Sequence, residues 1–132
     1  MVFADSGSNA LPVQMAIEAK QRGLTTVWLG SLKYARIAPL SVVGKKLFEV
    51  VDYVIDNGGT PGDAMLDVEG LEYPICPASG MGAAAVLWGV CAGIVEEMLA
   101  RGLTPTVLPS VNRPDGWTIV RKAEAEALRK GY

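Results

Sequence analysis

The first thirty residues constrain the fold of this chain more than any other feature. Residues 2–4 (VFA) are typical of the end of a buried strand, and a turn (DSGSN) follows at once. A helix is then expected over residues 10–22, with a proline in its first turn and a glycine after its end. The β-branched and aromatic run over residues 25–29 predicts a second strand. Such a strand–helix–strand crossover implies a parallel sheet and an α/β fold.

The rest of the chain continues this alternation. A third strand is expected at residues 53–56, and residues 32–43 (with Pro39) are expected to form a long connection. The other expected elements are a short helix at 44–51, a hairpin or edge strand over 64–69 and 72–76, a strand at 106–108 and a final helix at 117–130. Because no internal repeat or linker interrupts the pattern, residues 1–132 are predicted to form a single, partial domain.

One segment is almost entirely apolar. Residues 81–95 carry no charge and are followed by Glu96 and Glu97. A membrane span needs about 20 apolar residues, so the segment predicts no membrane association. A helix that is apolar on nearly all sides is expected to be buried in the fold or at a subunit contact, and we place it at residues 80–101.

Composition excludes several classes of function. The formal net charge is −2, so no basic excess points to nucleic acid. Cys76 and Cys91 lie far apart and form no CxxC pair, which favours a reducing cytoplasm over a metal site or a disulfide framework. No basic-then-apolar leader begins the sequence, so no secretion signal is expected. Since the chain has no histidine, an imidazole base or a histidine-ligated metal is excluded within it, and we expect no cofactor and no metal.

The strongest candidate for chemistry is the turn formed by Ser6, Gly7, Ser8 and Asn9. It lies between a predicted strand and the start of a helix, where backbone N–H groups lack partners and the helix dipole is positive. Serine hydroxyls would add donors, and glycine would let the backbone approach an anion such as phosphate. The alternative is that the serines only cap the helix. The turn matches neither the Walker loop nor the dinucleotide fingerprint.

The same region resembles the second βα unit of sugar-isomerase (SIS) domains, with a pattern closest to a little-characterised bacterial branch of that family. The similar positions continue in order along nearly the whole chain. They comprise residues 5–13, Ala16, residues 18–20, Gly23, 31–32, 44–47, Asp52, 54–57, 61–64, 69–71, Pro77, Ser79, 101–102 and 110–112. The resemblance implies a three-layer α/β/α sandwich with a mostly parallel, flavodoxin-like sheet, and a phosphosugar site lined by the serine-rich loop.

This sequence departs from the family pattern in ways that matter for the site. Ala4 replaces the first serine of the loop, and Ser8 stands where a basic residue is common. Residues 40–43 (LSVV) are more apolar than the family pattern. The helix and the first βα unit with which the family begins are also missing. By comparison with the family, we therefore expect the domain to be N-terminally truncated, and we expect a homo-oligomer or completion by another chain.

Other polar residues are weaker candidates. The resemblance places Ser79 near the sugar, and Ser31 follows a strand at the edge where open α/β sheets bind ligands. For both serines a role in a cap or a turn is an open alternative. Carboxylates are the only plausible bases, and the candidates are Glu18, Asp56, Asp63, Glu96 and Glu97, each of which is expected to be solvated. We therefore assign no catalytic residue.

Two functions follow from these observations. The chain is expected to be a cytoplasmic phosphosugar-binding domain, part of a sugar-phosphate isomerase or of a related phosphosugar-metabolising protein. The alternative is a non-catalytic sensor or regulatory module that binds the same ligands. The substrate-binding residues are expected to be Ser6, Gly7, Ser8, Asn9, Ser31 and Ser79.

Overall fold

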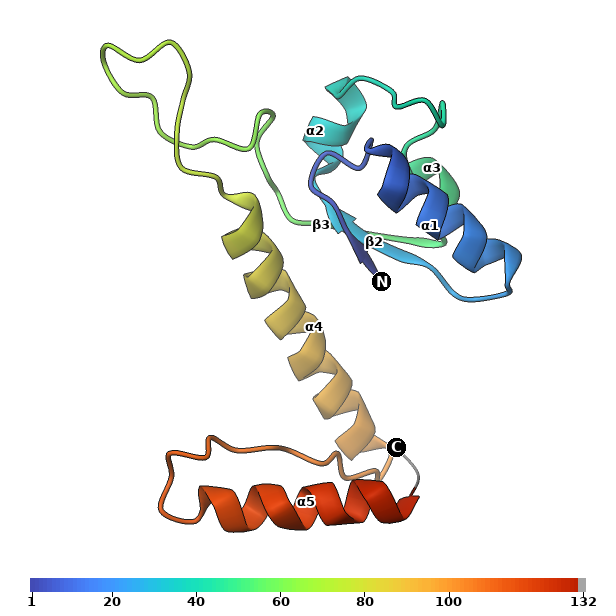
Figure 1. Cartoon of the computed structure of the whole chain (residues 1–132), viewed down its shortest axis with the longest axis vertical. Coiled ribbons are helices and arrows are strands. Elements are labelled where there is room, and N and C mark those ends of the chain that lie inside the picture. The colour runs from blue at the N-terminus through green and yellow to red at the C-terminus, as the bar shows by residue number, and fades with distance from the viewer. Residues whose placement is uncertain (131–132) are drawn as a thin grey trace. The chain divides into compact units, whose positions relative to one another are not determined.

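The computed structural model describes residues 1–130 and divides the chain into two compact units (Figure 1). The first unit is Met1–Val90 and the second is Cys91–Tyr132, so the boundary lies inside one long helix. Each unit is described by itself below. The expectation of a single domain stays a prediction.

A small parallel sheet forms the centre of the first unit. Its strands are β1 (Val2–Phe3), β2 (Val27–Gly30) and β3 (Tyr53–Asp56), in the order β1-β2-β3. Both pairings are parallel, and Trp28 lies opposite Val2 on one side and Val54 on the other. The predicted strands, their parallel direction and the α/β fold class are therefore confirmed.

The core lies between the sheet and two helices, α1 (Ala10–Gln21) and α3 (Leu47–Val50). Helix α1 contributes Val13 and Ala16, and α3 contributes Leu47 and Val50, all packed in one cluster with the fully buried Trp28. The indole nitrogen of Trp28 donates a 2.8 Å hydrogen bond to the carbonyl of Ala4, which satisfies the polar atom of this ring. The helices thus cover the face of the sheet to which Trp28 points.

A short helix, α2 (Leu32–Ile37), occupies part of the segment expected to be a connection. Ser31 begins it, because its hydroxyl accepts a 3.0 Å hydrogen bond from the Tyr34 amide. The expected helix at residues 44–51 is shorter than predicted, since the regular turn of α3 begins only at Leu47. Before it, Lys46 is buried and its ammonium donates to the Ala35 carbonyl.

The segment between β3 and the next helix is irregular. The expected hairpin is reduced to a single antiparallel bridge between Leu66 and Ile75. Two helices follow, α4 (Ser79–Ala100) and α5 (Gly116–Lys130), close to the predicted ranges. The strand predicted at residues 106–108 is wrong, because within the described residues this run has no neighbouring strand with which to form hydrogen bonds.

Helix α4 is exposed over most of its length. Of its residues only Ala83 is buried, while Met81 and Trp88 are each 74% exposed. The expectation that this helix is buried in the fold is wrong for the described residues, and its burial at a subunit contact stays a prediction. With 22 residues and a mean hydropathy of 1.6 over an 18-residue window, α4 is long and apolar enough to cross a membrane, so the expectation that this segment is too short for a span is wrong. A core helix of a soluble protein meets the same criterion, so this property alone assigns no membrane location.

Candidate functional site

The candidate site lies at the carboxyl edge of the parallel sheet, where all strands end together. Asp5 follows β1, Ser31 follows β2 and Asn57 follows β3. Ligands of open α/β sheets bind at this edge, because the connecting loops diverge there and expose backbone groups. Two features lie at this edge. One is the loop at residues 6–9, which has unpaired hydrogen-bond donors, and the other is a hydrogen-bonded network around Asp5.

The conformation of the loop depends on Gly7. This residue has a φ of +58°, and a Cβ atom added to it would lie 2.7 Å from Cζ2 of Trp28. Its amide donates to the Ala4 carbonyl at 3.0 Å, and its carbonyl accepts from the Leu47 amide at 2.7 Å. Glycine is thus required here by the left-handed backbone and by the indole ring. The close approach to an anion that the sequence suggested is therefore not needed to explain why residue 7 is glycine.

The loop presents donors that the protein itself does not use. Within the described residues, the amides of Ser6, Ser8 and Asn9 donate no hydrogen bond. The Ser8 hydroxyl is buried and donates to the Ser6 hydroxyl at 3.3 Å, and this leaves the proton of the half-buried Ser6 free to point outward. These groups lie beside the N-terminus of α1, where the helix dipole favours an anion.

The serines do not cap helix α1. The N-cap position belongs to Asn9, which makes no side-chain capping bond, and neither serine hydroxyl bonds an amide of the helix. The structural alternative raised by the sequence, a simple serine N-cap, is therefore wrong. Instead, the hydroxyls of Ser6 and Ser8 are hydrogen-bonded to each other.

Asp5 is a polar residue of this edge that the sequence analysis did not single out. Its Oδ1 atom accepts a 2.8 Å hydrogen bond from the Asn57 side-chain amide, and its carbonyl accepts from the Ser31 amide at 2.9 Å. Its Oδ2 atom is buried and has no hydrogen-bond partner among the described residues. Leaving a buried acceptor unpaired costs about 1–3 kcal/mol, and more when the group is charged. Its place just after β1 and before the serine loop is the sequence signal that could have identified it.

The hydroxyl of Ser31 makes its hydrogen bonds within the protein. Its side chain is completely buried, and its hydroxyl donates to the Gly59 carbonyl at 2.6 Å while accepting from the Tyr34 amide. The turn that it holds is tight, because a Cβ atom on Gly59 would lie 3.1 Å from Oδ1 of Asp5. Ser31 therefore supports the network around Asp5 and Asn57, and its hydroxyl has no free proton for a ligand.

The hydroxyl of Ser79 is likewise hydrogen-bonded within the protein. It is the first residue of α4, and both its amide and its hydroxyl donate to the carboxylate of Asp63, at 2.8 and 2.6 Å. Asp63 also accepts from the Ala78 amide at 3.0 Å, so it caps the start of α4. The Ser79 hydroxyl is the largest cause of the lowered pKa of Asp63, with the two amides adding to it. Asp63 is thus a capping group of α4.

A cavity of about 280 Å³ adjoins this edge. Its polar lining comes from the turn after β3, through Asn57 and Thr60, and its apolar lining includes Met65 and Met81. Asn57 connects the cavity to Asp5, because this residue lines the cavity and its side-chain amide donates to Asp5. The cavity and the network around Asp5 therefore share Asn57.

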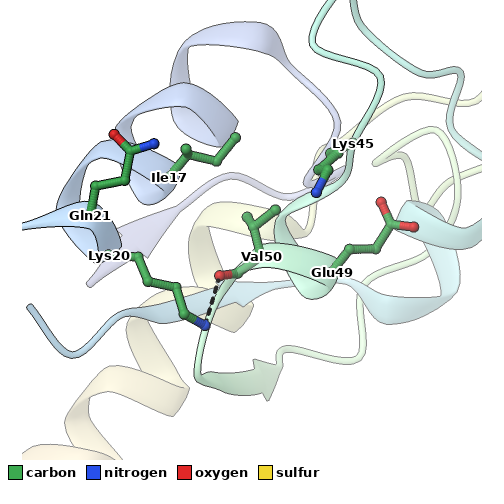
Figure 2. A pocket seen from close by; sticks show the side chains of 6 residues that line it. All are labelled: Ile17, Lys20, Gln21, Lys45, Glu49 and Val50. Carbon is green, nitrogen blue, oxygen red and sulfur yellow. Dashed lines mark hydrogen bonds between the residues drawn. The ribbon is translucent and has the colours of Figure 1, made fainter. Parts of the chain in front are cut away.

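A second hollow, of about 360 Å³, lies between α1 and α3 (Figure 2). Ile17 and Val50 give it an apolar wall, and Lys20 and Lys45 bring ammonium groups to it. The ammonium of Lys20 already donates to the Val50 carbonyl at 3.3 Å and pairs with Asp52 at 2.8 Å. Because the Lys20 ammonium already has these partners within the protein, we assign no ligand to this hollow.

Three of the other carboxylates considered as bases have structural partners, and the fourth, Glu96, is exposed on α4. Glu18 pairs with Arg22 at 2.9 Å and Glu97 with Arg101 at 2.6 Å, both one helical turn apart. Asp56 accepts from the amides of Leu32 and Gly58. Of the carboxylates considered as bases, these have no role at the site.

The first unit is thus an α/β fold with a donor-rich loop at the carboxyl edge of its sheet. The chain is similar to curated bacterial proteins named UPF0309 proteins. It is 34% identical over 116 residues to one from Shouchella clausii, which covers 87% of this chain and 47% of the relative. It is 38% identical over 117 residues to one from Streptomyces griseus, covering 88% of this chain and 47% of the relative. The chain spans about half the length of the curated relatives it matches. No family model matches it.

Proposed function

We propose that this chain binds phosphorylated sugars, with the phosphate held by the loop of Ser6, Gly7, Ser8 and Asn9. One observation carries the proposal: among the described residues, the amides of Ser6, Ser8 and Asn9 and the hydroxyl of Ser6 donate no hydrogen bond. Donors left free at a helix N-terminus suit a phosphate oxygen. Since Ser31 and Ser79 are committed elsewhere, Ser6 is the side chain that would contact the anion directly.

The proposed site is expected to be weak in this chain. Ala4 supplies no hydroxyl where the family pattern has one, and no lysine or arginine lies within residues 4–11. Affinity for a hexose phosphate is therefore expected to be millimolar, about −4 kcal/mol.

The activity of the longer protein is part of the proposal. We propose that it is a sugar-phosphate isomerase or a related phosphosugar enzyme, located in the cytoplasm. For this chain alone, the alternative of a non-catalytic phosphosugar sensor is favoured by one observation: Glu18, Asp56, Asp63 and Glu97 are all engaged in structural bonds. Moving a proton between two sugar carbons needs a base aimed at the sugar, which none of these carboxylates provides.

We further propose that the small sheet is part of a complete three-layer sandwich. The open edge of β1 and the exposed side chain of Phe3, 48% accessible, support an additional strand and helix layer. Parallel sheets are almost always covered on both faces, because the crossover helices lie there. The cover would come from the rest of a longer protein or from another copy of the chain.

Isothermal titration with glucose 6-phosphate, fructose 6-phosphate and N-acetylglucosamine 6-phosphate tests the binding proposal, with unphosphorylated glucose as the ligand control. Replacing Ser6 by Ala removes a donor to a charged acceptor, and should weaken binding by about 1.5–3 kcal/mol. The matched control is Ser41→Ala, since Ser41 also lies in a loop and its hydroxyl bonds only the Val43 amide among the described residues. Equal binding by both variants, or no binding of any phosphate, would refute the proposal.

A further inference from the structure

Charge is unevenly distributed along this chain. Residues 47–100 contain nine aspartates and glutamates and no lysine or arginine, whereas residues 101–132 contain six lysines and arginines and three aspartates and glutamates. Three of the acidic residues, Asp67, Glu69 and Glu72, lie in the loop between β3 and α4 (Figure 1). The sequence therefore contains an acidic segment followed by a basic one.

The loop at residues 64–77, here called the acidic loop, is held by hydrogen bonds at its base and along its sides. At the base, Asp63 accepts from the Ser79 amide at 2.8 Å. Further out, Leu66 and Ile75 exchange two backbone hydrogen bonds, at 3.0 and 2.9 Å. A compact loop whose ends are close together presents a defined surface, and such loops are frequently functional.

The acidic loop exposes apolar side chains together with its carboxylates. Leu71 and Tyr73 are both exposed, and Tyr73 reaches an exposed fraction of 72%. Asp67 and Glu69 are exposed as well, and neither pairs with a cation among the described residues. An exposed apolar patch with a polar rim is typical of an interaction surface.

Helix α5 carries complementary groups on its exposed side. Arg121 lies over the ring of the exposed Trp117, 5.9 Å from its centroid, and Arg129 is exposed about two turns further on. Leu128 is 82% exposed. Because a helix repeats about every 3.6 residues, these four side chains lie on one side of α5, with Glu124 at its edge. This side therefore offers cations and apolar groups to an acidic partner.

We propose that the acidic loop of one copy of this chain docks on helix α5 of a second copy. Each copy carries both complementary surfaces, so a two-fold pair makes the same contact twice and satisfies both surfaces of both chains. The opposite charges select this pairing, and burial of Leu71, Tyr73 and Trp117 stabilises it. This inference is independent of the proposed phosphosugar binding.

Charge reversal in the complete chain tests the contact. One variant combines Asp67→Lys with Glu69→Lys in the acidic loop, and the other combines Arg121→Glu with Arg129→Glu in α5. Each variant alone places like charges against each other in both contacts, so its dissociation constant in sedimentation equilibrium should rise about tenfold or more. In an equal mixture of the two variants, both contacts again join opposite charges. The dissociation constant should then return to within about threefold of that of the unaltered chain.

The matched control reverses two exposed cations of another helix, Lys33→Glu with Arg36→Glu in α2. It should leave the dissociation constant unchanged. The melting temperatures of all variants at high salt should match that of the unaltered chain, because every replaced side chain is exposed. A second measurement needs no variant: raising sodium chloride from about 0.05 M to about 0.5 M should weaken association, since salt screens exposed charges.

Three results would overturn the proposal. The first is a chain that stays monomeric at low salt. The second is association that neither salt nor either variant weakens, which would place the contact on apolar surfaces alone. The third is a mixture that associates as weakly as each variant by itself, while a chain carrying all four changes associates normally. That result would place the contact within a single copy.

Discussion

At the scale of single residues, carboxylates in this chain are placed by the hydrogen bonds that they accept. Asp52 lies near the start of β3 and accepts from the Thr26 amide and hydroxyl, both at 2.8 Å. It also pairs with Lys20 of α1, and this bond is the main reason why the pKa of Asp52 is lowered to about 2. The contact joins the end of α1 to the amino edge of the sheet.

The Asp52 contact predicts an acid sensitivity. Because the pKa is about 2 in the folded chain against an ordinary 3.8, the stabilisation is complete above pH 3.8 and is lost as the pH falls toward 2. Urea unfolding measured at pH 5, 4, 3 and 2.5 should show a falling free energy of unfolding, and the fall should be smaller in Asp52→Asn. The same pH dependence in both proteins would contradict the assignment.

The cap at α4 gives a second residue-level prediction. Asp63 accepts from the amides of Ala78 and Ser79, so Asp63→Ala should cost about 1 kcal/mol of stability, as losses of helix caps do. Hydrogen exchange should become faster at the first amides of α4 while the amides of β2 stay protected. Unchanged exchange at the start of α4 would show that Asp63 does not hold it.

At the scale of elements, the loop after β1 is fixed by its glycine. Gly7→Ala introduces a Cβ atom 2.7 Å from Trp28 at a φ of +58°. The expected loss is about 1–2 kcal/mol from the backbone and about 1–3 kcal/mol more from the clash with the ring. Gly23→Ala is the control, because Gly23 has a φ of +75° with no atom within 4 Å of an added Cβ. Equal losses in urea unfolding would show that the ring contact does not restrain the loop.

The elements also show how far sequence reasoning reaches. The strands at residues 2–4, 25–29 and 53–56 were predictable, because β-branched runs alternate with helical patterns along a crossover. Helix α2 was not, since its start depends on one serine hydroxyl and its length is only 6 residues. The false strand at 106–108 has the right residue types, but a strand needs a neighbour, and local composition carries no information about neighbours.

The site was predictable only in part. The loop at residues 6–9 follows β1 and precedes α1 as the pattern predicted, and among the described residues the amides of Ser6, Ser8 and Asn9 donate no hydrogen bond. Ser31 and Ser79 were expected to contact the ligand, yet their hydroxyls bond Gly59 and Asp63, residues that are distant in sequence. Asp5 was not singled out for the same reason, because its Oδ1 atom bonds the side chain of Asn57, 52 residues away in the sequence. Long-range partners decide whether a polar side chain is free, and a single sequence does not contain them.

At the scale of the whole molecule, helix α4 exposes more apolar side chain than an isolated soluble chain usually tolerates. Met81, Trp88, Ile94 and Leu99 are all more than half exposed. We expect a second copy of the chain to cover this helix, and sedimentation equilibrium should give a mass above the 14.0 kDa of one chain. Iodide should then quench Trp88 poorly in a chain carrying Trp117→Phe. A single 14.0 kDa species with a readily quenched Trp88 would contradict this expectation.

The central claim is that the loop after β1 holds the phosphate of a sugar phosphate. The most direct measurement is a titration of the ¹⁵N-labelled chain with glucose 6-phosphate, followed amide by amide. The account predicts saturable shifts at Ser6, Gly7, Ser8 and Asn9 at millimolar ligand, with little change at α5. Shifts confined to surfaces away from this loop, or none at all, would contradict it.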